Sequence, residues 1–184
     1  VAIKLAKIYS KDNRIEKSKI FYTGFSYGSG QVLKFQDSRI QSQNPFRAGV
    51  AAEPGCNIVS NPAKTNFATL MIKGEESHYY PIACETYYKM IKKVGNKIEY
   101  VSIPKVNHFF SLNGKIGKGK AVNGCSKNIL IRYSDGSFRF QDGTPSDRRG
   151  RFKCFTKESA GGEKNRAKLN HAINLSLNFL DKYK

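Results

Sequence analysis

A serine at the apex of a predicted turn is the first residue of this sequence that could do chemistry. Ser26 is the centre of a G-x-S-x-G pattern over residues 24–28, after an apolar run at 20–22 and before a helix-compatible segment at 31–37. A strand, a sharp turn and a helix in this order lift the serine hydroxyl clear of a sheet. The pattern predicts a nucleophile, with the backbone N–H of Tyr27 facing the place where an oxyanion forms. An ordinary Gly/Ser turn is the alternative interpretation.

A histidine further along the chain could act as the general base for this serine. His108 follows a segment, 97–103, that alternates like a strand. A positioned imidazole can take the serine proton at neutral pH and return it to a leaving group. A single histidine is often structural, but its place after a strand end and downstream of the serine turn favours the catalytic interpretation.

The remaining pattern predicts the elements that position these two residues. We expect a helix at the start of the chain, strands at 48–52 and 67–72, and a helix from 82 to 94. A last helix is expected from 163 to 184, packed on the sheet through an apolar face made of Leu169, Ile173, Leu177 and Leu180.

Together these residues resemble the C-terminal part of an α/β-hydrolase of the dienelactone hydrolase family. The matching pieces are Gly24-Phe25-Ser26-Tyr27-Gly28, Ala48-Gly-Val-Ala-Ala52 running into Pro54-Gly55-Cys56, Gly74-Glu75 with Pro81, and Pro104 with His108-Phe109. The resemblance implies an α/β fold with a doubly wound, mostly parallel sheet and a site at the strand C-terminal ends. It also implies hydrolysis of a small ester or related acyl substrate through an acyl-enzyme, without a metal or organic cofactor.

The sequence departs from the family at two positions. The family carries cysteine where this chain has Ser26, so the resemblance favours a serine ester hydrolase over dienelactone cleavage itself. The family also places its aspartate three residues after the strand-ending glycine, and that residue is Ser77 here. Glu53, which ends the preceding strand, and Glu76, on the same loop as Ser77, could each replace it. Glu53 is favoured, and an incomplete triad is the third interpretation.

The family resemblance also implies strands and an oxyanion loop before the serine strand, which residues 1–19 do not supply. The serine strand would then lie at an open sheet edge, which proteins rarely leave bare. We therefore expect this chain to be part of a longer polypeptide or to pair with another chain. The corresponding functional alternative is a catalytically impaired split or truncated hydrolase that acts as a subunit or binding module.

Residues 111–162 are expected to form an insertion within a single domain spanning 1–184. A glycine- and lysine-rich stretch, 113–120, predicts a loop, and the segments 128–133 and 137–140 predict a β-hairpin around Asp135-Gly136. A lid role and plain structural decoration are both open. Cys125 and Cys154 bracket the hairpin and could form one disulfide, while Cys56 and Cys84 could form another. No spacing resembles a zinc site.

Charge and composition narrow the possible partners. The net charge of +18 is spread along the chain and favours acidic partners in general, but no nucleic-acid motif accompanies it. Binding to nucleic acid or another acidic surface is therefore a third hypothesis. No apolar run is long enough to span a membrane. The sequence does not decide between a cytoplasmic and an exported protein. Disulfide bonds would favour export. Among the other histidines, His78 could contact substrate, whereas His171 is expected to be exposed.

Overall fold

A parallel sheet of four strands forms the centre of the computed structural model, which describes residues 1–111, 118–147, 149–159 and 165–184. Its strands are β1 (Phe21–Phe25), β2 (Ala48–Ala52), β4 (Ala68–Gly74) and β5 (Ile98–Ile103), paired in the order β1-β2-β4-β5. All three pairings are parallel. The predicted α/β class with a mostly parallel sheet is therefore confirmed.

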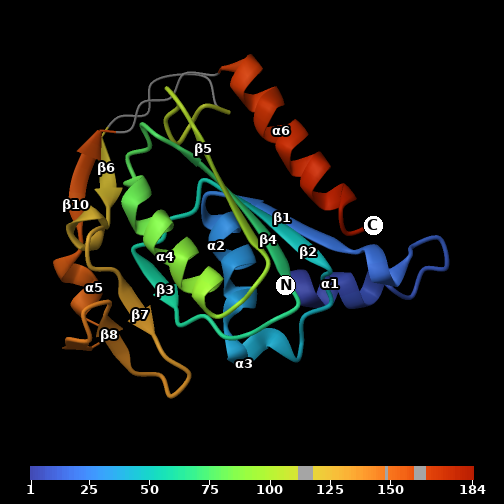
Figure 1. The fold of residues 1–184 in the computed structure, drawn as a ribbon, viewed down its shortest axis with the longest axis horizontal. Helices are drawn as coiled ribbons and strands as arrows, with labels where there is room; N and C mark the ends of the chain where they lie inside the picture. Colours follow the sequence, from blue (N-terminus) through green and yellow to red (C-terminus); the bar gives the residue numbers. More distant parts are fainter. Residues whose placement is uncertain (112–117, 148, 160–164) are drawn as a thin grey trace.

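Helices cover both faces of this sheet because successive side chains of a strand point to opposite sides. Ala51 of β2 and Met71 of β4 belong to a core that includes residues of α2 (Tyr27–Leu33) and α4 (Pro81–Lys93). Their neighbours Val50 and Leu70 belong to a second core, with residues of α6 (Arg166–Asp181). Figure 1 shows α2 and α4 next to each other over the strands, with α6 away from them.

The helix after Ser26 begins earlier than the sequence indicated. We expected it over 31–37, but α2 starts at Tyr27, and a 3-10 turn, η2 (Lys34–Gln36), continues it. The expected segment is helical up to Gln36, and only its start was misplaced, because glycines at 28 and 30 lower the intrinsic helix propensity of the first turn. A short helix, α3 (Ser38–Gln41), then leads toward β2. The N-terminal helix, α1 (Ala2–Tyr9), is present as expected.

Helix α6 packs on the sheet through part of the predicted face, because Leu169 and Leu180 contact the core as expected. The buried residues are Ala172 and Phe179, whereas Ile173 and Leu177 are 46% and 55% exposed. The helix contacts β2 and β4. Ile173 and Leu177 line a groove that also contains Thr23 of β1, and their side chains stay exposed there. Among the described residues β1 pairs only with β2, and it forms one edge of the sheet.

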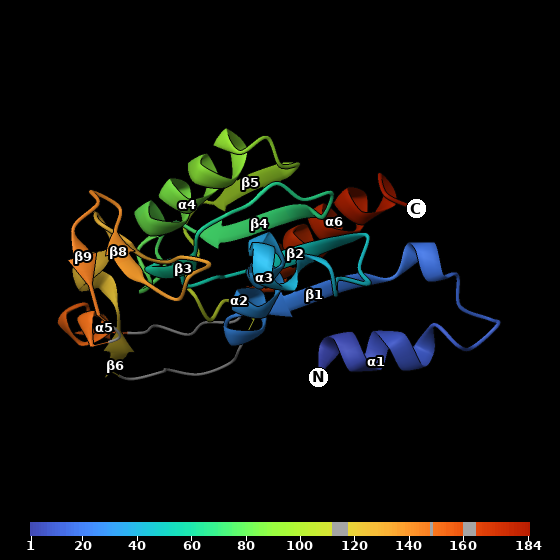
Figure 2. The same cartoon turned by 90° about the horizontal axis from the view of Figure 1, so that it is seen from below.

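The insertion contains the predicted hairpin and joins the main body through an unpredicted strand. The hairpin consists of β7 (Leu130–Arg132) and β8 (Phe138–Phe140), and β8 also pairs with β9 (Pro145–Ser146). The short strand β3 (Ile58–Ser60) pairs with β7 in parallel. Figure 2 shows this second sheet at the opposite end of the molecule from α1.

The predicted loop at 113–120 is only partly described. Residues 112–117 lie outside the described residues, but Lys118–Ala121 form the strand β6, so the loop prediction is wrong at its end. Strand β6 pairs antiparallel with β10 (Thr156–Ser159). The 3-10 turn η3 (Asn123–Cys125) and the helix α5 (Gly150–Lys153) complete the insertion.

Two disulfides connect these parts. Cys56 is bonded to Cys84, and Cys125 to Cys154, the same pairs that the sequence suggested. The first joins the segment after β2 to the start of α4, and the second joins the two ends of the hairpin region. Among the described residues, no helix combines the length and apolar character needed to cross a bilayer.

The turn between β1 and α2 places Ser26 in a strained conformation. Ser26 has φ 53° and ψ −115°, a region that residues with a side chain rarely adopt. A methyl group built on Gly24 would lie 2.3 Å from the backbone of Gly28, so strand and helix approach each other too closely for any side chain there. A methyl group on Gly28 itself would meet nothing within 4 Å.

Replacing Phe179 with alanine should lower the free energy of unfolding by about 3–5 kcal/mol, because it leaves a cavity where the buried ring of α6 packs on the sheet. The same truncation of Leu177, which is exposed, should cost less than about 1 kcal/mol. Urea denaturation followed by circular dichroism measures both. Equal losses in the two variants would mean that α6 is rotated relative to this structure.

Gly24→Ala should lower the free energy of unfolding by about 3 kcal/mol, because the added methyl group overpacks the turn against the Gly28 backbone. Gly28→Ala is the matched control and should stay within about 1 kcal/mol of wild type, on the stabilising side, because alanine is the better helix former. Chemical denaturation of the pair tests the turn, and an unaffected Gly24→Ala protein would contradict it.

Candidate active site

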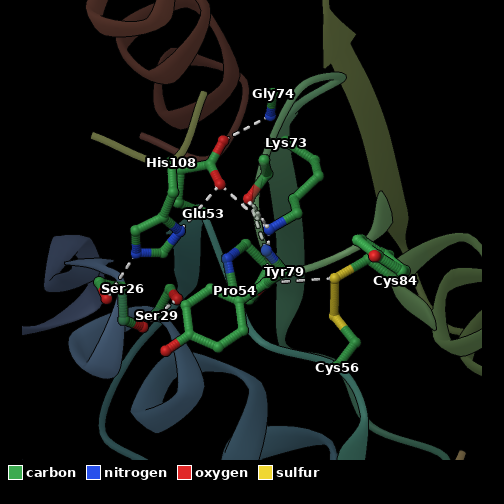
Figure 3. Close-up of a disulfide and its surroundings, with 12 residues drawn as sticks. Ser26, Ser29, Glu53, Pro54, Cys56, Lys73, Gly74, Tyr79, Cys84 and His108 are labelled. Atoms are coloured by element: carbon green, nitrogen blue, oxygen red, sulfur yellow. Dashed lines mark hydrogen bonds and ion pairs between the residues drawn. A yellow bond between two sulfur atoms is a disulfide. The ribbon is translucent and has the colours of Figure 1, made fainter. Parts of the chain in front are cut away.

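The C-terminal ends of three parallel strands bring the predicted catalytic residues to one edge of the sheet. Ser26 follows β1, Glu53 follows β2, and His108 lies on the segment after β5. Parallel strands end on the same side, so residues just past their ends can meet although they are far apart in sequence. Figure 3 shows the three side chains in a row, with Glu53 on the far side of His108 from Ser26.

Hydrogen bonds connect these three side chains into a chain. Nε2 of His108 lies 2.8 Å from Oγ of Ser26, and Nδ1 of His108 lies 3.1 Å from Oε2 of Glu53. A carboxylate can only accept, so Nδ1 carries the ring proton in the neutral imidazole. Nε2 is then the acceptor and the serine hydroxyl the donor, which is the direction that proton removal from Ser26 requires.

Glu53 is held firmly in this arrangement. Its side chain is fully buried, its φ of 54° lies in the left-handed region, and its Oε1 accepts a hydrogen bond from the N–H of Gly74. Burial alone would raise the pKa of Glu53, but the hydrogen bond from His108 and the charge of Lys73 outweigh it, so its pKa is lowered. Glu53 is therefore an ionised carboxylate at neutral pH.

Lys73 is the residue of this site that sequence analysis missed. Its side chain is fully buried, and Nζ lies 3.0 Å from Oε2 of Glu53, 3.1 Å from the Pro54 carbonyl oxygen and 2.9 Å from Oγ of Ser77. Burial lowers the pKa of Lys73, and the Glu53 carboxylate opposes that shift. A lysine near the end of an apolar strand was the available signal, but a strand-end lysine usually extends into solvent.

The two positions considered for a displaced acid have other environments. Ser77 lies where the resemblance places an aspartate, and its hydroxyl accepts from Lys73. Glu76 is exposed, and its N–H donates to the Val106 carbonyl oxygen. The structure therefore brings Glu53 to His108 and leaves Glu76 at the surface, because the chain turns after Gly74 and directs residue 76 outward.

Aromatic side chains surround the imidazole of His108. The rings of His78, Tyr79 and Phe109 have centroids 4.9, 5.0 and 4.6 Å from it, and that of Phe25 lies at 5.6 Å. Burial, and then the nearby charges of His108 and Lys73, lower the pKa of His78 to about 4. A neutral His78 therefore lies beside the candidate base, which is compatible with the predicted substrate contact. His171 is exposed on α6, as expected.

The backbone N–H that the sequence predicts as an oxyanion donor lies on the serine side of the site. Tyr27 is the first residue of α2, so its backbone N–H has no acceptor within the helix. Its side chain is 83% exposed. No group of three or more metal-binding side chains occurs in the part of the chain that the structure describes.

Comparisons with known proteins give only structural matches. No family model matches the sequence, and no curated protein matches it. A structure assigned as a dipeptidyl aminopeptidase IV from Bacteroides ovatus ATCC 8483 has a TM-score of 0.51 and 13% identity, over 58% of this chain and 19% of that one.

Two smaller proteins resemble the chain more loosely. Esterase 2 of Thermogutta terrifontis, solved after phosphorylation by paraoxon, has a TM-score of 0.48 and 17% identity over 60% of this chain and 51% of its own. A protein assigned as a dienelactone hydrolase from Klebsiella pneumoniae subsp. pneumoniae MGH 78578 has a TM-score of 0.47 and 17% identity, over 58% and 47%.

The chain thus spans about a fifth to a half of the length of these structures. At such low identity the likeness concerns the fold alone. The parallel sheet, the helices on both of its faces and the structural match lead to one conclusion: the chain has a partial α/β-hydrolase fold.

Proposed function

We propose that this chain is a serine hydrolase that cleaves a small ester or related acyl substrate through an acyl-enzyme. The observation that carries the proposal is the chain of hydrogen bonds from Ser26 through His108 to a buried, ionised Glu53. The three groups have the types and the order that nucleophilic catalysis by serine requires. The strained backbone of Ser26 and Glu53 supports it, because such strain gathers at functional sites.

In the proposed first half-reaction, Oγ of Ser26 bonds to the substrate carbonyl carbon while Nε2 of His108 takes the hydroxyl proton. The negative charge on the carbonyl oxygen is stabilised by the N–H of Tyr27 and the positive end of α2. His108 then gives its proton to the leaving alcohol as the carbon–oxygen bond breaks. Glu53 holds the imidazole in the correct tautomer and stabilises its charged form.

In the second half-reaction, water replaces the alcohol. His108 takes a proton from the water as its oxygen bonds to the acyl carbon, and it returns the proton to Oγ of Ser26 as the acid leaves. The scheme needs only these side chains and water, without a metal or organic cofactor. One oxyanion donor is worth about 10²–10³ in rate, so a site with a single donor would be slow.

The open edge of the sheet favours a second, compatible role as a subunit. Strand β1 carries the proposed nucleophile and pairs with one strand only among the described residues. Ile173 and Leu177 of α6 are exposed beside it, in the groove that also contains Thr23 and Phe25. Proteins rarely leave such an edge uncovered. We propose that another chain covers β1. This chain would then be one subunit of a hydrolase, either an active subunit or a catalytically impaired one.

A fluorophosphonate probe should label the wild-type chain, and Ser26→Ala should abolish the labelling because the attacking oxygen is gone. Glu53→Gln should slow labelling by about a hundredfold or more, because a neutral amide cannot stabilise the imidazolium. Glu76→Gln is the matched control and should label at the wild-type rate. Labelling that persists in Ser26→Ala, or a slowed Glu76→Gln protein with a normal Glu53→Gln one, would contradict the proposed roles.

Sedimentation should show the wild-type chain as a dimer or larger particle, since an exposed parallel edge and its apolar groove favour association. The double variant Ile173→Lys/Leu177→Lys should shift the chain toward the monomer, because it places two charges in the groove. His171→Lys, exposed on the same helix, should leave association unchanged. A wild-type chain that stays strictly monomeric across the concentration range would reject this role.

A further inference from the structure

A fully buried ammonium group beside the candidate triad has no explanation in packing. Moving a charged amine out of water costs several kcal/mol, and an apolar residue of similar volume often stabilises such a place at least as well. Lys73 nevertheless has its whole side chain buried at the end of β4. Its three N–H donors have three acceptors, on Glu53, Pro54 and Ser77. Three acceptors are the number that a protonated amine can use, so the geometry fits the ammonium form even though burial lowers the pKa of Lys73.

The acceptor that Lys73 shares with His108 is a single oxygen atom. Oε2 of Glu53 accepts hydrogen bonds from both Nζ of Lys73 and Nδ1 of His108, while Oε1 accepts one from the N–H of Gly74. Three donors from three directions define the plane of the carboxylate. Without Nζ, each oxygen keeps one donor, His108 on Oε2 and Gly74 on Oε1, so the carboxylate is held less tightly about its last bond.

We propose that Lys73 is a positioning residue that fixes the orientation of Glu53 and moderates the negative charge that His108 experiences. The effect of Lys73 on catalysis rests on the proposed hydrolase function. Its effect on the orientation of Glu53 does not. Lys73 does not touch the reacting atoms. It acts on the proton transfer only through the carboxylate between it and the imidazole.

The charge argument has a definite sign. The titratable groups that contact His108 are Glu53 from the end of β2 and His78 and Tyr79 from the segment after β4, and Lys73 of β4 is bound to the same Glu53 oxygen as His108. An unscreened Glu53 carboxylate would favour the imidazolium, which cannot accept the serine proton. The Lys73 cation, bound to the same carboxylate oxygen, offsets part of that field. His78, which the Lys73 charge also affects, should respond in the same direction.

The direct test is an NMR titration of the imidazole ring of His108, which needs no catalytic activity. The chain has three histidines, so His78→Phe and His171→Gln assign the signals. In Lys73→Met, the pKa of His108 should rise by about one unit because a cation near it is lost. Lys89→Met, which removes an exposed lysine on α4, is the matched control and should cause no shift. An unchanged His108 titration in folded Lys73→Met would overturn the proposal.

Kinetics of probe labelling then separate a positioning role from a structural one. Lys73→Met should slow labelling by about ten- to a hundredfold, as expected for a misplaced catalytic group, and should move the acid limb of the pH profile upward. In the Glu53→Gln background the same substitution should change the rate by less than about twofold, because the path through the carboxylate is already lost. Equal losses in both backgrounds would mean a general structural effect and would reject the proposal.

Circular dichroism establishes that each variant is folded before either measurement. Should Lys73→Met not fold, Lys73→Gln carries the same test, since it keeps an N–H donor in place and removes the charge. It should raise the pKa of His108 while slowing labelling less than the methionine would. Absence of labelling in the wild-type chain would reject the proposed hydrolase function alone, because the NMR titration would still decide the role of Lys73.

Discussion

The buried carboxylate of Glu53 is the group on which the rest of this site depends. It lies in the interior, where an isolated charge is strongly unfavourable, and it is ionised only because a cation, an imidazole and a backbone N–H all bind it. Two of these partners, Lys73 and Gly74, belong to β4, and His108 lies on the segment after β5. The carboxylate therefore connects β2, β4 and the segment after β5, and a change in any of them affects the orientation of His108.

The fold supplies this convergence through parallel strands that end on one side of the sheet. The proposed nucleophile and acid lie at the ends of neighbouring strands, and both have positive φ angles. Such conformations are maintained only where the surroundings hold them. For Ser26 the glycine at 24 allows the close approach of strand and helix. For Glu53 the N–H donates to the Ile72 carbonyl oxygen of β4.

Most of the architecture could be predicted from the sequence because it depends on local patterns. The apolar run at 48–52, the helix after Pro81 and the Asp135-Gly136 hairpin each carry their own signal, and the G-x-S-x-G turn fixes the place of Ser26. Glu53 could be ranked above Glu76 because it ends a strand. In each case a short segment contains the information.

What sequence reasoning missed depends on contacts between distant segments. The pairing of β3 with β7 involves three residues on each side, too short for a pattern of its own. The buried face of α6 was assigned only in part, with Leu169 and Leu180 right and Ile173 and Leu177 wrong, because only the structure shows which strands the helix contacts. The role of Lys73 depends on acceptors at 53, 54 and 77, which no spacing rule connects.

The Cys56–Cys84 bond anchors only one side of the site, the acidic arm that carries Glu53, and not the side that carries Ser26. It ties the segment that begins with Glu53 and Pro54 to the first turn of α4, so the acidic arm has a covalent anchor. Ser26 has no such anchor, and it follows β1, which is an edge strand paired with β2 alone among the described residues. Gradual warming should therefore disorder the turn at Ser26 while Glu53 and Lys73 are still in place.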